Sequence, residues 1–153
     1  MKTREALSVQ VEKDFPVPVE QLYHAWVTPD ALKQWWRPMD NYLKEVDNDV
    51  REGGSFRYVF QNRNNDHSFE ITGHYHEVKK EERLVYSWNW NVSDEAVTDS
   101  HFTLTITFIN RGNNSRLEVV QENFSDEESV QPHREGWEKA LDDLNQFVST
   151  SAV

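Results

Sequence analysis

The sequence predicts an α+β fold, in which a curved antiparallel sheet of six to seven strands wraps around a long C-terminal helix. Three observations favour this fold class. Apolar and polar residues alternate through most of the segment 42–124, as in strands with one buried face. Two short helical patterns precede that segment. After it, apolar residues recur at helical spacing, and a helix of that kind needs an apolar sheet to cover it.

The N-terminal part begins with a strand and continues with a helix. The first strand is expected at residues 7–15, where apolar and polar residues alternate, and Pro16 ends it. A short helix then carries Leu22, Ala25 and Trp26 on one face.

A second short helix is expected directly afterwards. Residues 28–30 read Thr-Pro-Asp, which supplies a cap, a proline at the first helical position and an acid in the first turn. Pro38 is expected to stop the helix after the Trp35-Trp36 pair. Because adjacent helical residues diverge by about 100°, one of these two rings is expected to point away from the surroundings of the other.

The following segment has a period of two and predicts a meander of antiparallel strands. Its hairpin connections are expected at residues 53–54, 62–66, 79–82 and 110–114, where glycine, asparagine and charged residues gather. The alternating, inward-facing sets are Phe56, Tyr58 and Phe60; Phe69, Ile71, Gly73 and Tyr75; Leu84, Tyr86, Trp88 and Trp90; Phe102, Leu104, Ile106 and Phe108; and Leu117, Val119 and Gln121.

The C-terminal segment predicts one long amphipathic helix. Residues 125–128 have the spacing of a capping box, and Pro132 is expected to start the main helix or to kink it. The apolar stripe that would face the sheet consists of Trp137, Leu141, Leu144 and Val148.

Composition excludes several classes of function. A net charge of -11 opposes binding to nucleic acid or to an anionic membrane surface. Cysteine is absent, which excludes disulfides, thiolate catalysis and sulfur-bound zinc. A single domain spanning residues 1–153 is expected from the length. No signal peptide or membrane-spanning stretch is found, so a cytoplasmic location is expected.

The order of these elements, together with several short motifs, resembles a known family. The motifs cover nearly the whole chain: residues 19–26, Thr28-Pro29-Asp30-Ala31-Leu32, Trp35-Trp36-Arg37-Pro38, residues 52–57, 73–78 and 83–88, and Gly136-Trp137 followed by Leu141 and Leu144. They are similar to those of the helix-grip, START-like (SRPBCC) superfamily, which contains the birch pollen allergen. Within it, the chain resembles the family of activator of heat-shock protein 90 ATPase homologues.

The resemblance implies a cavity between the sheet and the long helix, and three functions remain open. Relatives hold lipids, sterols or polyketides there, which favours an apolar small molecule as ligand. The eukaryotic activators bind heat-shock protein 90, which favours a chaperone or another protein as partner, although their additional N-terminal domain is missing here. Other relatives are cyclases or aromatases. Fold alone does not choose among these functions.

The residues expected to line the cavity combine the inward sheet positions with the helix stripe. They are Trp36, Phe56, Tyr58, Phe69, Trp88, Phe102, Leu104, Gln121, His133, Trp137 and Leu141. Gln121 takes an inward position where many relatives carry a polar residue, often histidine. Gln121 and His133 either orient the polar end of a ligand or form a structural hydrogen bond between sheet and helix.

No catalytic constellation, metal site or cofactor is expected. His74 and His76 share one strand face with Glu70, but that face is the wet one. Phosphate-binding loops, nucleophile elbows and zinc-binding helices have no match. Binding without chemistry, by a monomer or a weak homodimer, is therefore the favoured interpretation. If the placement of the long helix is correct, Trp137→Ala lowers both stability and binding.

Overall fold

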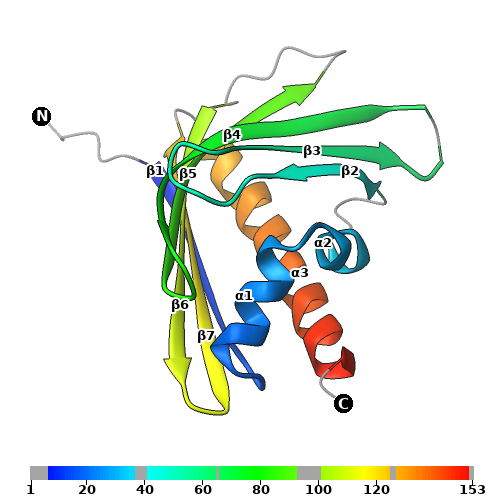
Figure 1. The fold of residues 1–153 in the computed structure, drawn as a ribbon. Helices are drawn as coiled ribbons and strands as arrows, with labels where there is room; N and C mark the ends of the chain where they lie inside the picture. The colour runs from blue at the N-terminus through cyan, green and yellow to red at the C-terminus, as the bar shows by residue number, and fades with distance from the viewer. Residues whose placement is uncertain (1–6, 37–40, 65, 93–100, 125–126, 152–153) are drawn as a thin grey trace, which may run out of the picture.

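The computed structural model describes residues 7–36, 41–64, 66–92, 101–124 and 127–151, and its elements follow the predicted order (Figure 1). In chain order they are β1 (Leu7–Phe15), α1 (Val19–Val27), α2 (Pro29–Trp35), β2 (Asn41–Asn48), β3 (Ser55–Asn62), β4 (Ser68–Lys79), β5 (Arg83–Val92), β6 (His101–Arg111), β7 (Asn114–Phe124) and α3 (Glu127–Ser151).

The seven strands form one sheet in the order β1-β7-β6-β5-β4-β3-β2, and every neighbouring pair is antiparallel. The sheet curls around α3, while α1 and α2 lie beside that helix on the open side of the curve (Figure 1). The predicted helix-grip fold class is therefore confirmed. The period-two alternation predicted this fold class because one face of each strand is buried against the helices.

The concave face of the sheet carries large aromatic residues, and glycine makes room for one of them. A Cβ atom on Gly73 would lie 2.0 Å from the Ser87 carbonyl oxygen and 2.7 Å from Cε2 of Phe56. The Phe56 ring thus occupies space that any side chain at position 73 would need. Phe56, Tyr58 and Trp88 are at most 3% exposed.

The two short helices begin where the sequence predicts, but their ends differ in detail. Thr28 precedes α2 without a side-chain capping hydrogen bond, and its hydroxyl lies 3.2 Å from Nδ1 of His24 instead. Helix α2 ends at Trp35, so Trp36 takes an extended conformation. The expectation that the two rings diverge is wrong, because it assumed that both residues are helical. Their rings stack with centroids 5.5 Å apart and an interplanar angle of 5°.

Helix α3 begins within the segment of the predicted capping box, so of the two roles expected for Pro132, the start of the main helix is wrong. It begins at Glu127, so Pro132 lies inside the helix and does not start it. Proline removes one hydrogen bond to the preceding turn, and so close to the N-terminus the helix continues through it. Ser125 and Asp126 of the predicted capping box lie outside the described residues. The predicted apolar stripe is confirmed, since all four of its residues are buried.

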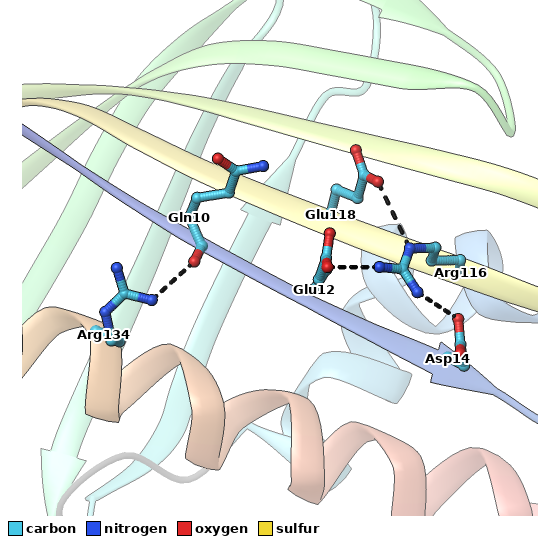
Figure 2. Close-up of polar contacts among 6 residues, drawn as sticks. All are labelled: Gln10, Glu12, Asp14, Arg116, Glu118 and Arg134. Atoms are coloured by element: carbon cyan, nitrogen blue, oxygen red, sulfur yellow. Dashed lines mark hydrogen bonds and ion pairs between the residues drawn. The ribbon is translucent and has the colours of Figure 1, made fainter.

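Helix α3 lies along the edge strand β1 and is attached to it by polar contacts. Nη1 of Arg134 donates a hydrogen bond to the backbone carbonyl of Gln10 over 3.0 Å, which occupies an acceptor of the sheet edge (Figure 2). Farther along, Lys13 and Asp142 form an ion pair of 3.1 Å. On the outer face, Arg116 joins β1 to β7, and Figure 2 shows its guanidinium among Glu12, Asp14 and Glu118.

Candidate functional site

Five tryptophan side chains meet between the concave face of the sheet and the three helices. Trp26 comes from α1, Trp35 and Trp36 from the end of α2, Trp88 from β5 and Trp137 from α3, and each is at most 6% exposed. We call these five residues the tryptophan cluster. Because they come from both ends of the chain, the cluster joins helices and sheet into one core.

Trp36 is central to the tryptophan cluster. Its ring stacks on Trp88 with centroids 5.6 Å apart and on Trp26 with centroids 6.4 Å apart. The edges of Tyr58 and Phe60 meet it at 5.5 and 5.6 Å. Trp26 in turn stacks on Trp137 at 6.1 Å. The surroundings of this region are therefore flat aromatic surfaces with polar groups only at their rims.

One of those rim groups is the amide of Gln121, which lies at the side of the cluster nearest β7. Oε1 of Gln121 accepts a hydrogen bond of 2.7 Å from Nε1 of Trp137, and the Gln121 side chain is fully buried. An indole nitrogen can only donate, so this contact fixes which end of the amide faces Trp137. The sheet and α3 are thus joined by a buried hydrogen bond.

The other end of the same amide is left without a partner. Within the described part of the chain, Nε2 of Gln121 is buried and forms no hydrogen bond. Its cross-strand neighbours are Val9 on β1 and Leu104 on β6, both buried and apolar in their side chains. A buried, unpaired N–H group costs about 1–3 kcal/mol. This donor is therefore the chemically unusual feature of the interior.

His133 lies on α3 one helical turn before Trp137, the hydrogen-bond partner of this amide. Its ring packs on Phe102 with centroids 5.2 Å apart. His133 is half-buried, whereas Phe102 is 3% exposed. Gln121, Trp137, Phe102 and His133 together form what we call the glutamine corner. Through His133 the glutamine corner reaches the protein surface.

A second group of polar atoms joins α1 to strands β2, β3, β4 and β5. The hydroxyl of Tyr58 bonds to that of Tyr75, which donates to Oδ1 of Asn48, and Nδ2 of Asn48 donates to the carbonyl of Val27. Nε1 of Trp26 donates to the Tyr86 hydroxyl over 3.2 Å. These bonds fasten the C-terminal end of α1 to the sheet.

Burial changes the acidity of the three phenols in this group. It raises the pKa of the Tyr58 and Tyr86 hydroxyls well above the ordinary value. Burial also raises the pKa of Tyr75, although the hydrogen bonds to Tyr58 and Asn48 act in the lowering direction. All three phenols are therefore neutral at physiological pH, and none is poised as a general base.

The structure brings most of the predicted cavity residues together. Nine of the eleven are buried, while Phe69 and His133 are half-buried. Phe69 stacks on Phe60 with centroids 4.9 Å apart. That these residues bind a ligand stays a prediction.

Three contributors to the interior were missed as site residues. The sequence pattern placed Trp26 on the apolar face of a short helix, and that face was the signal that could have identified Trp26 as a site residue. Asn48 lies in a polar stretch with no distinguishing pattern. Asn145 carries the second buried side-chain atom without a partner among the described residues, Oδ1, and lies about 12 Å along α3 from Trp137.

The outer face of the sheet has no sign of a metal site in the described part of the chain. His74 and His76 are exposed, and Glu70 pairs with Arg57 at 2.6 Å. Within the described ranges, no group of three or more potential metal ligands is found. No helix among the described residues is long and apolar enough to span a membrane.

Comparison with known proteins adds the family. The model of the family described as Activator of Hsp90 ATPase homolog 1-like protein matches residues 16–149. No curated protein matches the chain.

Three solved structures are similar over most of their lengths. A protein of Chromobacterium violaceum is 26% identical, with 92% of this chain and 96% of that chain covered and a TM-score of 0.79. The AHSA1 protein of Silicibacter pomeroyi is 23% identical, with coverage of 95% and 99% and a TM-score of 0.80. The AHSA1-like protein of Aeromonas hydrophila is 18% identical, with coverage of 95% and 94% and a TM-score of 0.77.

Proposed function

The chain belongs to the family of Activator of Hsp90 ATPase homolog 1-like proteins, and from this membership and the interior geometry we propose that it binds a small apolar molecule. Family and fold support a ligand-binding or protein-binding domain in general terms. The proposed ligand lies between the concave face of the sheet and α3, in the glutamine corner and against the tryptophan cluster.

The observation that carries this proposal is the unpaired Nε2 of Gln121. Buried polar groups in native proteins are nearly always hydrogen-bonded, so an orphaned donor in an apolar interior calls for a partner. Binding sites for small molecules have this composition: aromatic walls and a few convergent polar groups that orient the ligand. The free energy of binding would come from about 25 cal/mol per Å² of apolar ligand surface removed from water.

The test is native mass spectrometry of protein purified from its own host. We expect a stoichiometric added mass under gentle conditions that is lost when the chain unfolds. Trp137→Ala should lose this mass, because the Trp137 ring belongs to both the core and the proposed site. Tyr42→Ala is the matched control, because Tyr42 is an exposed aromatic residue on β2 and should leave the added mass in place. If wild-type protein shows no added mass under gentle conditions, this result would count against a tightly held ligand.

A protein partner is the second candidate, favoured by the aromatic filling of the interior. Because the interior rings are already in contact, a small-molecule ligand would have to displace side chains. A protein partner would instead bind the outer surface. Glu135, Glu138 and Asp142 are exposed on α3 and would suit a basic partner surface. The family description makes heat-shock protein 90 the first partner to test.

A charge-reversal experiment separates this candidate from the first. Glu135→Lys/Glu138→Lys should abolish binding of heat-shock protein 90 in calorimetry, if that surface is used, and should leave the added mass of the native spectrum unchanged. Lack of heat release with the wild-type chain would remove this candidate.

A further inference from the structure

We infer that the ligand of the glutamine corner is a flat ring, about the size of one indole, that carries a neutral carbonyl oxygen. This inference rests on the proposed function and adds the chemical class of the ligand. It depends on the hydrogen-bond polarity, the charge and the shape of the surroundings of Gln121.

Hydrogen-bond polarity comes first. Trp137 can only donate, so Oε1 of Gln121 already accepts one hydrogen bond, from the indole N–H at 2.7 Å. The unpaired hydrogen-bond donor of the amide is Nε2, whose N–H bonds need an acceptor. A carbonyl oxygen has two lone pairs and no hydrogen, so it meets that need and brings no unpaired donor of its own. A hydroxyl ligand would also have to place its own hydrogen, either on the second lone pair of Oε1 or among the apolar side chains of Val9 and Leu104.

Charge comes second. Within the described ranges, the buried polar or charged residues are Asn41, Ser115 and Gln121, and none of them is ionic. A carboxylate at Nε2 would lose its hydration without a buried cation to compensate, which costs several kcal/mol. The neighbouring cation on α3, Arg134, is directed to the Gln10 carbonyl at the sheet edge (Figure 2). His133 is half-buried, so water screens its ring. These surroundings favour a neutral acceptor over an anion.

Shape comes third. Trp26 and Trp137 stack with an interplanar angle of 20°, and Trp36 and Trp88 with an angle of 13°. A guest that packs against these flat surfaces matches them best if it is itself a flat ring. The rings are already in contact, so the guest must take the place of a side chain of similar size. The Phe102–His133 pair is the part of the wall that includes a half-exposed ring, and its displacement would open the glutamine corner from the surface.

The test compares three molecules that share one bicyclic skeleton. 1-Indanone carries the neutral carbonyl, indane carries no polar group, and 1-indanecarboxylate carries an anion. Each is titrated into the ¹⁵N-labelled full chain, and binding is followed at the side-chain NH₂ resonances of Gln121, which Gln121→Met assigns by their loss. We expect 1-indanone to shift these resonances and to bind at least about tenfold more tightly than indane or the carboxylate, equivalent to about 1.4 kcal/mol.

The variants then locate the preference. Gln121→Met keeps a side chain of similar length without the amide and should bind 1-indanone and indane equally. Gln131 is an exposed glutamine on α3 that bonds to Glu135, so Gln131→Met should keep the wild-type preference. The comparison of the three molecules in wild-type protein remains decisive if Gln121→Met fails to fold.

The outcomes separate this inference from the proposed function. Equal binding of indane and 1-indanone, or tighter binding of the carboxylate, overturns the carbonyl inference and leaves an apolar ligand site standing. Absence of binding by all three molecules overturns the ligand site in the glutamine corner, and the inference with it. A carbonyl preference that survives in Gln121→Met places the acceptor elsewhere and also overturns the inference.

Discussion

At position 121 a single amide serves both the core and the proposed site. Its oxygen bonds to the indole of Trp137 and so ties β7 to α3, while its nitrogen is buried without a partner in the described structure. Replacing the amide by a hydrocarbon removes a favourable bond and an unfavourable orphan together. The two effects are separable, because only the first depends on Trp137.

A double-mutant cycle measures the favourable part. Gln121→Leu leaves the Trp137 N–H without an acceptor, which costs about 1–3 kcal/mol, and it also removes the unpaired Nε2, so we expect a net fall in the free energy of unfolding that is smaller than this cost. Gln121→Leu/Trp137→Phe removes both partners, so its loss should be about 1–2 kcal/mol smaller than the sum of the single losses. Urea unfolding gives all three values. Additive losses would mean that the hydrogen bond contributes nothing to stability.

Sequence reasoning predicted the direction of Gln121 but not its partner. Strict alternation from Leu117 and Val119 placed the side chain inward, because a strand has a period of two. The bond to Trp137 depends on where α3 lies over the sheet, and no local pattern encodes that. At Trp36 the local argument was wrong, because it took Trp36 as helical. The helix ends one residue earlier, and this changes the direction in which the Trp36 ring points.

The buried phenols predict a loss of stability at high pH. Burial raises the pKa of Tyr58, Tyr75 and Tyr86 above the value of about 10 that they have when unfolded. Above that pH the unfolded chain releases these protons while the folded chain keeps them. The associated stability is thus complete below about pH 10 and is lost as the pH rises toward the folded pKa values, by about 1.4 kcal/mol per phenol and pH unit.

Urea unfolding at about pH 9 and about pH 11 measures this loss, with tyrosinate absorbance to report ionisation. The buried phenols should ionise only on unfolding. Tyr86→Phe should reduce the pH dependence, because it removes one of the phenols whose pKa is raised by burial, a group that also includes Tyr23. Ionisation of these phenols before unfolding would contradict their burial.

At the scale of the elements, β4 and β5 meet at a point where only glycine fits. Tyr75 and Tyr86 are cross-strand partners, and the ladder shifts register between Tyr75 and Glu77. Close by, Gly73 lies under the Phe56 ring and beside the Ser87 carbonyl. Backbone contact is what makes this position strict, because a carbonyl in a paired strand cannot move aside as a side-chain end can.

Two glycine-to-alanine variants should therefore have opposite effects. Gly73→Ala forces a Cβ to within 2.0 Å of the Ser87 oxygen, and we expect a loss of about 2–4 kcal/mol in the free energy of unfolding. Gly136→Ala lies in α3 with no atom within 4 Å of the added Cβ, and we expect a gain of about 0.5–1 kcal/mol. Thermal unfolding of both variants tests this, and a stable Gly73→Ala would show that the β4–β5 ladder can shift.

The apolar stripe and the capping-box segment 125–128 both located α3, whereas Pro132 did not mark its start. Trp137, Leu141, Leu144 and Val148 follow the helical period, and their burial is a property of the whole helix. Pro132 was a poorer guide, because a proline excludes one hydrogen bond and leaves the rest of the helix intact.

For the whole molecule, charge and core make opposite demands. The chain has 27 acidic and 16 basic residues and a net charge of -11, and among the residues that the structure describes no charged side chain is buried. Ion pairs such as those of Arg116 with Glu12 and Asp14 compensate part of the net charge locally. Composition was enough to predict this surplus, whereas the pairing of the charges required the fold.

We therefore expect salt to stabilise the folded chain. Salt weakens exposed ion pairs, each worth about 0.2–1 kcal/mol, and it also screens the repulsion among the surplus acids. Because acids outnumber bases, the second effect should exceed the first, and raising NaCl from about 0.01 M to about 0.5 M should raise the Tm by about 3 °C. Glu52→Lys, at an exposed loop residue, changes the net charge from -11 by +2 to -9 and should reduce this gain. Calorimetry at both salt concentrations gives the comparison. A falling Tm would mean that the ion pairs on the sheet contribute more to stability than the net repulsion removes.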